Sequence, residues 1–188
     1  ARKGFFGSEW IGWENFAFLF NRPQFMQVIV NTIIISTFKL ICGMPVPILF
    51  ALLLNEVRQR FFKRSVQTIT YFPHFLSWVV YGGLMLIFLG PGGPVLSLLD
   101  SLGFHDVRIL TNREIFRGVL VGTDILKGFG WSAIIYLAAI TSVDPMLYEA
   151  ARVDGANRWQ QMLYITLPAI RGTIAVIFIL NLGSILNA

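Results

Sequence analysis

Few residues of this chain have the types and spacing that catalysis or metal binding requires. The single cysteine is Cys42, and the two histidines, His74 and His105, lie far apart with no cysteine near either of them. They match no metal-ligand spacing. A membrane glycosyltransferase would need paired carboxylates or a histidine cluster at a membrane face, and Asp100 with Asp106 is a poor substitute. We therefore predict no catalytic residues and no metal site.

Nucleotide binding has no better support. The sequence contains no G-x-x-x-x-G-K-[ST] segment, the glycine-rich loop that cradles phosphates in many ATPases. This chain therefore cannot hold ATP in that manner.

The polar residues of greatest interest lie inside long apolar segments. A charge at the bilayer centre costs at least about 2.5–3.5 kcal/mol unless it faces protein or water. Such residues mark a candidate path for a solute, and aromatic faces among them could hold a sugar ring. The set comprises Asn31, Lys39, His74, Trp78, Asp124, Lys127, Trp131, Tyr136 and Asn181.

Two of these charges could form a pair. Asp124 and Lys127 are three residues apart and therefore share one face of a helix. The pair is either part of a path or a structural lock for the bundle, and the structural role is favoured. Lys39 could reach past a kinked helix to water, and the aromatic residues could equally be lipid-facing anchors.

A polar loop between two apolar segments carries the most specific pattern. It reads E-A-A-x-x-x-G-x9-I-x-L-P, which fixes Glu149, Ala150, Ala151, Gly155, Ile165, Leu167 and Pro168. Asp144-Pro145 signals a helix start, because the carboxylate can cap free amides and the proline loses no hydrogen bond there. Gly155 suits a left-handed helix end, and a second helix is expected from Asn157.

This pattern resembles the cytoplasmic coupling loop of importer permeases in the ATP-binding cassette (ABC) family. In that family the loop docks in a cleft of the ATPase subunit and transmits its closure. By resemblance the contact falls on Glu149, Ala150, Ala151 and Gly155, with Asp154, Ile165, Leu167 and Pro168 in the same loop.

Other segments resemble the carbohydrate-uptake branch of the same family. They are A-L-L-L-N-E at 51–56, Y-F-P-H-F at 71–75 and D-G-A-N-R-W at 154–159. The closest likeness is to permeases for oligosaccharides and polysaccharide fragments. It corresponds to the middle of a permease with six spans, so we expect a fragment that lacks the first and last spans.

The resemblance also implies partners. The chain would be a transport subunit with no cofactor of its own, while ATP and Mg²⁺ would be bound by a separate ATPase dimer. A second, related permease would complete a heterodimer, which is favoured over a homodimer. A solute-binding protein outside the bacterial inner membrane would deliver the sugar.

Composition independently predicts a membrane protein. Hydrophobic residues make up 55% of the chain and charged residues 13%, against about 25% charged residues in soluble domains. A bilayer needs about 20 mostly apolar residues per helical span. The net charge of +5 then fits loops beside anionic lipid better than nucleic-acid binding.

We expect an all-α, polytopic bundle of four transmembrane spans with a cytoplasmic helical loop. The spans are expected at 25–54, with a kink at Pro45 and Pro47, at 68–89, at 115–140 and at 167–187, and the coupling loop at 143–168. A further short helix is expected at 95–99.

Orientation follows from the loops. Arg58, Arg60, Lys63 and Arg64 crowd the loop 55–67, and short loops rich in Lys and Arg normally stay in the cytoplasm. Together with the coupling-loop resemblance, this places 55–67 and 141–166 inside and 90–114 outside.

Other functions stay open at this level. The same loop occurs in permeases for peptides, amino acids and ions. A polytopic membrane glycosyltransferase, a passive channel and an assembly scaffold are the alternatives outside that family.

The topology can be tested by labelling. Single cysteines at Gln59, Gly92 and Asn157, in a Cys42→Ala background, would be treated with an impermeant thiol reagent from each side. We expect Gln59 and Asn157 to react from one side and Gly92 from the other, because the loops alternate across the membrane. Labelling of all three from one side would refute the model of four spans.

Overall fold

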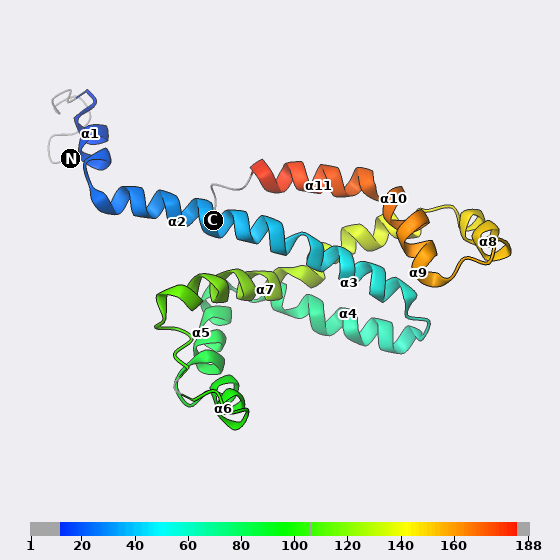
Figure 1. The fold of residues 1–188 in the computed structure, drawn as a ribbon, viewed down its shortest axis with the longest axis horizontal. Coiled ribbons are helices and arrows are strands. Elements are labelled where there is room, and N and C mark those ends of the chain that lie inside the picture. Colours follow the sequence, from blue (N-terminus) through cyan, green and yellow to red (C-terminus); the bar gives the residue numbers. More distant parts are fainter. Residues whose placement is uncertain (1–11, 106, 184–188) are drawn as a thin grey trace.

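The computed structural model describes residues 12–105 and 107–183, and within them every regular element is a helix. Figure 1 shows an elongated bundle in which α2, α3, α4, α7 and α11 run roughly along the long axis. The helices are α1 (Glu14–Phe20), α2 (Pro23–Gly43), α3 (Pro45–Glu56), α4 (Arg60–Phe75), α5 (Trp78–Leu89), α6 (Pro94–Ser101), α7 (Arg113–Thr141), α8 (Pro145–Val153), α9 (Arg158–Gln161), a π-helical turn η2 (Met162–Thr166), α10 (Leu167–Ala169) and α11 (Arg171–Gly183).

The apolar helices match the expected all-α membrane bundle. Three stretches are long and apolar enough to cross a membrane: Pro23–Glu56, Trp78–Ser101 and Ile115–Thr141. A fourth is present if Arg158–Ala169 and Arg171–Gly183, which meet at a bend of 58°, are counted as one span.

The first stretch is interrupted where the prolines were expected to act. The helix α2 ends at Gly43 and α3 begins at Pro45, one residue later. Proline has no amide hydrogen and its ring crowds the preceding turn, so Pro45 and Pro47 cannot continue the hydrogen-bond ladder of α2. Both halves still follow one another along the bundle (Figure 1).

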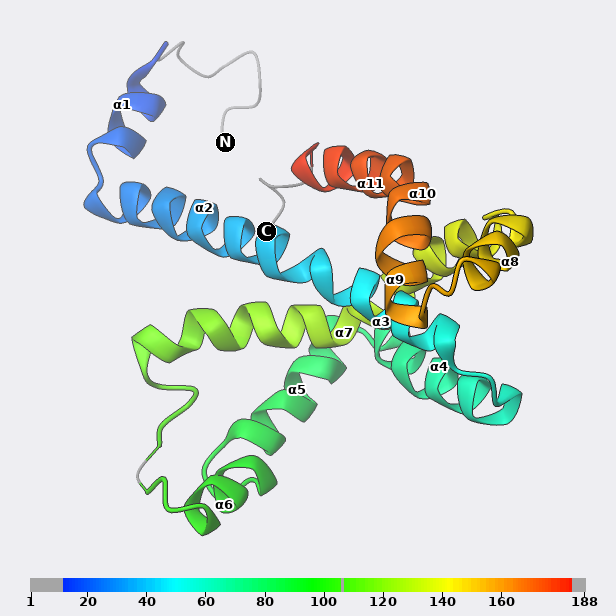
Figure 2. The ribbon, with the colours of Figure 1, turned by 45° about the vertical axis from the view of Figure 1, so that its right-hand side comes forward.

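The second expected span, 68–89, differs more. The chain leaves the helical conformation at Leu76 and Ser77, which have ψ angles of 138° and 153°, so α4 and α5 are separate helices. Ser77 caps α5, because its hydroxyl accepts a hydrogen bond from the Val80 amide at 3.2 Å. Hydropathy alone did not reveal this break. In Figure 2, α5 runs away from the axis of α4 toward α6.

The buried core lies between α3 and α7. Ala51, Leu52 and Leu54 of α3 face Ala133, Tyr136, Leu137 and Ile140 of α7, and the cluster is completed by Met162 and Ile170. Met162 lies in η2, near the end of the polar loop, and Ile170 lies just after the loop. The core therefore fixes the base of that loop against the two central helices.

Close packing of α4 against α7 depends on one glycine. A Cβ atom at Gly130 would collide with the backbone carbonyl of Thr70, whereas one at Gly128 would meet no atom within 4 Å. The absence of a side chain at Gly130 thus allows the two helices to approach.

We predict that Gly130→Ala lowers the free energy of unfolding by about 1–3 kcal/mol, since the added methyl group must push α4 away from α7. Thermal unfolding of the purified protein in detergent would measure the loss. Gly128→Ala is the matched control on the same helix and should cause no loss. Equal stability of the two variants would contradict the packing described here.

Candidate functional site

The polar loop begins with a helix that its own sequence caps. The Asp144 carboxylate accepts a hydrogen bond from the Met146 amide at 2.9 Å, and Pro145 occupies the first position of α8. At the other end Gly155 has a φ of +80°. The Ala156 amide donates to the Ala151 carbonyl at 2.8 Å and the Gly155 amide to the Arg152 carbonyl at 3.1 Å. This is the Schellman arrangement, which requires a left-handed residue at Gly155.

A second helix starts directly after this turn. The Asn157 side chain accepts from the Gln160 amide at 2.9 Å, while the Gln160 side chain accepts from the Asn157 amide at 2.8 Å. This reciprocal pair is a capping box. The Gln161 side chain also donates to the Ala156 carbonyl at 2.9 Å. Both helices and the turn between them are therefore held by local hydrogen bonds.

The loop formed by α8 and α9 lies at one end of the molecule (Figure 1). Glu149, Ala150, Asp154 and Gly155 are exposed and Ala151 is half-buried. Beside them Met146, Leu147, Val153 and Trp159 are all more than half exposed. Apolar side chains gathered on a protruding loop are typical of a surface that another protein covers.

Two long-range contacts connect this loop to the bundle. The hydroxyls of Tyr148 and Thr166 lie 2.9 Å apart and share a hydrogen bond, and Thr166 is buried in η2. Arg158 forms an ion pair with Glu56 at the end of α3, with Nη1 and Oε2 3.5 Å apart. Sequence reasoning missed both contacts, because nothing in the spacing relates Tyr148 to a residue 18 positions later.

The last residues of the predicted loop motif lie in η2 and α10, which lead into the apolar helix α11. Ile165 and Leu167 are half-buried, and Leu167 packs against the core, whereas Pro168 is exposed in α10. Immediately after Pro168, the helical segments on either side of Ile170 meet at a bend of 58°. The motif thus runs from an exposed helix to a bent, buried helix base.

A polar seam joins α2 to α7. Arg117 Nη2 donates to Asn31 Oδ1 at 2.7 Å, and Lys39 Nζ lies 3.4 Å from Asp124 Oδ1. The two contacts are separated by seven or eight residues on each helix, about two turns, so they lie on the same side of both helices.

The structure corrects the expected pairing of Asp124 with Lys127. Asp124 pairs with Lys39 across the helix interface, and Lys127 donates to the His74 carbonyl at 3.0 Å. Spacing along one helix indicated a shared face, but neighbouring helices supplied a partner for each residue. Sequence alone could not show which residue of α2 faces Asp124.

Four predicted path residues meet at the break between α4 and α5. The His74 and Trp131 rings stack at 4.7 Å with 3° between their planes. Lys127 Nζ lies 4.9 Å from the centre of the Trp78 ring. Phe75, which was not predicted, contacts the edge of Trp131 at 5.4 Å. We call His74, Phe75, Trp78, Lys127 and Trp131 the aromatic cluster.

The other predicted path residues lie elsewhere. Tyr136 is 1% exposed in the core between α3 and α7, and its hydroxyl has no hydrogen-bond partner within the described residues. A ring buried in this way packs the core and presents no face to a solute, which corrects the expectation for Tyr136. Asn181 is exposed on α11, a helix that contributes no residue to the seam or to the aromatic cluster.

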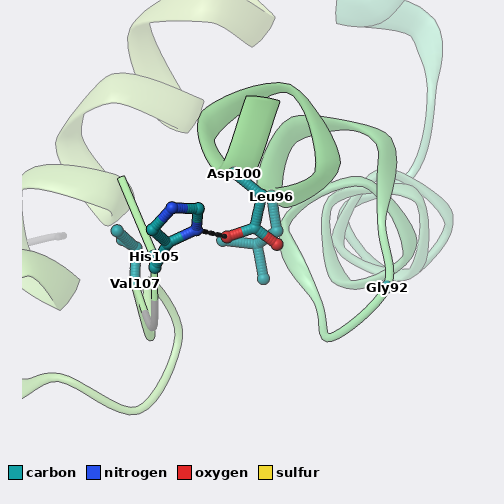
Figure 3. A pocket seen from close by; sticks show the side chains of 5 residues that line it. All are labelled: Gly92, Leu96, Asp100, His105 and Val107. Atoms are coloured by element: carbon teal, nitrogen blue, oxygen red, sulfur yellow. Dashed lines mark ion pairs between the residues drawn. The ribbon is translucent and has the colours of Figure 1, made fainter. Parts of the chain in front are cut away.

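The segment that follows α5 forms an open pocket of about 430 Å³, lined by Gly92, Leu96, Asp100, His105 and Val107. Figure 3 shows His105 pointing toward Asp100, with Nδ1 and Oδ1 3.7 Å apart. Asp106, the other carboxylate weighed above, lies outside the described residues. In the described part of the chain no three His, Cys, Asp or Glu side chains are grouped to hold a metal ion.

Comparison with known proteins identifies the family. Residues 43–188 match the family described as "Binding-protein-dependent transport system inner membrane component". The chain belongs to this family. It is therefore a permease component of the inner membrane, with several apolar helices.

Two relatives of this permease component come from Bacillus subtilis. One is the polygalacturonan/rhamnogalacturonan transport system permease protein YteP, 48% identical over 98% of the chain. The other is protein LplB, 42% identical over 98% of the chain. The chain spans 58% of the length of each of them.

A solved structure shares the fold of this permease component. It is a bacterial ABC transporter involved in the import of the acidic polysaccharide alginate, with a TM-score of 0.90 and 46% identity. The match covers 97% of this chain and 64% of that chain. A second crystal structure shows a bacterial alginate ABC transporter in complex with an alginate pentasaccharide-bound periplasmic protein, with a TM-score of 0.89 and 46% identity over 95% of this chain and 62% of that chain.

The ion pair in the seam can be tested by a double-mutant cycle. Lys39→Met or Asp124→Asn alone leaves one charge without its partner, and the double variant removes both charges. Because each side chain is about one third exposed, we expect a coupling free energy on the order of 1 kcal/mol, measured by unfolding in detergent.

The matched control is the same cycle on Asp124 and Lys127, which the structure does not pair. Its coupling should be smaller than that of Lys39 and Asp124. Simple additivity for Lys39 and Asp124 would count against the seam.

Proposed function

We propose that this protein is a membrane-spanning permease subunit of an ABC importer for an oligosaccharide or polysaccharide fragment. A solute-binding protein outside the membrane delivers the sugar. The permease passes it inward by alternating access, and a separate ATPase dimer hydrolyses ATP with Mg²⁺. A second, related permease completes the pore as a heterodimer.

The observation that carries this proposal is the preformed, exposed loop of α8 and α9. Its hydrogen bonds hold the backbone in one shape before any partner binds, which lowers the entropy cost of docking. Its small residues, Ala150 and Gly155, leave room for another chain to approach the helix. Its apolar side chains Met146 and Val153 supply the surface that docking would bury.

The contacts behind the loop support coupling to the bundle. The Tyr148–Thr166 hydrogen bond links α8 to η2, which leads into α11, and the Arg158–Glu56 pair links α9 to α3. A displacement of α8 by an ATPase would therefore act on two apolar helices at once. These connections are what a permease driven from outside its own chain needs.

The solute class rests on the relatives and on the aromatic cluster. One relative is named as a polygalacturonan/rhamnogalacturonan transport system permease. Another, also from Bacillus subtilis, is named as an arabinooligosaccharides transport system permease and is 30% identical over 86% of this chain. Trp78 and Trp131 provide exposed aromatic faces, and such faces bind the apolar faces of sugar rings. Membership in a transport family favours the permease hypothesis over the alternative of a membrane glycosyltransferase.

If the loop docks on an ATPase, substitutions in the loop should abolish coupling between the permease and the ATPase. Gly155→Val places a β-branched residue at a φ of +80°, which costs at least about 1 kcal/mol and breaks the turn. Ala151→Trp adds bulk at the docking surface. We expect each variant, in the complete complex reconstituted in proteoliposomes, to lose sugar uptake and substrate-stimulated ATP hydrolysis, or to release the ATPase, while the permease still inserts.

Two control variants separate docking from general damage. Gly103→Val imposes a similar strain, because Gly103 has a φ of +90° in the segment that follows α5. Ser101→Trp adds the same bulk there. Both should leave the ATPase attached. Normal uptake with a tightly bound ATPase in both loop variants would contradict the assignment of this segment as the coupling loop.

A further inference from the structure

A buried lysine in the aromatic cluster has no carboxylate partner. Lys127 is 7% exposed, and its ammonium donates one hydrogen bond, to the His74 carbonyl at 3.0 Å. The described residues contain three ion pairs, Lys39 with Asp124, Arg158 with Glu56 and His105 with Asp100, and none of them includes Lys127. The acidic residue nearest to it in sequence on α7, Asp124, is thus already paired.

A buried ammonium without a counter-ion is energetically costly, and this one is only partly compensated. A lysine ammonium has three N–H donors, of which one is used here. Its remaining neighbours are the ring faces of Trp78 at 4.9 Å and Tyr81 at 5.9 Å, which attract a cation but accept no full hydrogen bond. The Tyr81 hydroxyl itself donates to the Thr123 carbonyl at 2.9 Å. An incoming anion would complete the site.

The surroundings indicate what kind of anion fits. The Trp78 ring, whose centre lies 4.9 Å from the ammonium, is 58% exposed and presents a flat apolar face beside the charge. Trp131, which stacks on the His74 ring, is 43% exposed. A sugar ring can lie against such a face while a carboxylate on the same ring reaches the lysine. One ammonium balances one negative charge, which suits a carboxylate better than a phosphate group carrying about −1.5 to −2.

We propose that Lys127 is the counter-ion for a carboxylate of the solute, and that the permease therefore carries acidic, uronate-containing oligosaccharides. This inference rests on the proposed function and assigns the solute class within it. Lys127 acts as a specificity-determining residue, and the neighbouring Trp78 holds the ring that bears the carboxylate.

A purely structural role for Lys127 must be separated from this one. The His74 carbonyl lies in the last turn of α4, where carbonyl groups lack partners within the helix, so Lys127 also closes the end of α4. Lys127→Gln removes the charge and shortens the side chain by one atom but keeps N–H donors. Lys127→Arg retains the charge.

The test uses the complete complex in proteoliposomes with its solute-binding protein. Uptake of a labelled galacturonate trisaccharide is compared with uptake of the same trisaccharide after full methyl esterification. We expect Lys127→Gln to reduce uptake of the acid by at least about tenfold relative to the ester, since a charge-assisted hydrogen bond is lost. Lys127→Arg should preserve the preference. Arg64→Gln, an exposed position on α4, removes a positive charge elsewhere and should behave as wild type.

A second measurement does not depend on the solute-binding protein. The galacturonate trisaccharide should raise the melting temperature of the solubilised wild-type complex and of Lys127→Arg, but not that of Lys127→Gln. An equal reduction of acid and ester uptake in Lys127→Gln, with an unchanged thermal shift, would show a structural role and overturn the inference. So would a wild-type complex that imports neutral oligosaccharides but no uronate. The absence of ATP-dependent uptake of any sugar would instead contradict the proposed function itself.

Discussion

A polar side chain among apolar helices is costly unless another group pairs with it, and the helix α7 makes several of the polar contacts between helices here. It carries Arg117 and Asp124 toward α2, and Lys127 toward the end of α4. Its opposite end packs Tyr136 and Leu137 against α3. In a hydrocarbon environment these polar contacts cannot be exchanged for water, so they fix which helices are neighbours. The positions of the loop and of the aromatic cluster both follow from this one helix.

The loop and the cluster are related through the same framework. The loop follows the end of α7 directly, and its helices are tied to α3 and to η2, which leads into α11. The cluster lies where α4 breaks before α5, against the middle of α7. The helix α7 therefore connects the two, because it leads into the loop at one end and borders the cluster in its middle. Interruptions at Met44, at Leu76 and Ser77, and at Ile170 are the places where such helices can bend.

The parts of this structure that local chemistry determines could be predicted from the sequence. The cap at Asp144, the left-handed turn at Gly155 and the start of α9 at Asn157 each depend on residues within a few positions. The apolar segments likewise predicted an all-α membrane bundle, and the loop motif pointed to the family that the comparison confirmed. In these cases the physical cause and the sequence signal lie in the same short window.

Contacts between helices could not be predicted in the same way. The Lys39–Asp124 pair joins residues 85 positions apart, and its formation depends on how α2 is rotated against α7. Tyr136 is an aromatic residue of the type that can bind sugars, but it lies on the face of α7 that meets α3. The break at Ser77 depends on a single capping hydroxyl inside an apolar segment, which a hydropathy average does not detect.

The most direct test of the central claim is transport by the complete complex. Permease, its partner permease, the ATPase and the solute-binding protein would be reconstituted in proteoliposomes, and accumulation of labelled oligosaccharides would be measured. We predict accumulation that requires ATP with Mg²⁺, the ATPase and the solute-binding protein together. Equilibration of the sugar without the ATPase, as through a passive channel, or no uptake of any oligosaccharide by the complete complex, would contradict the account.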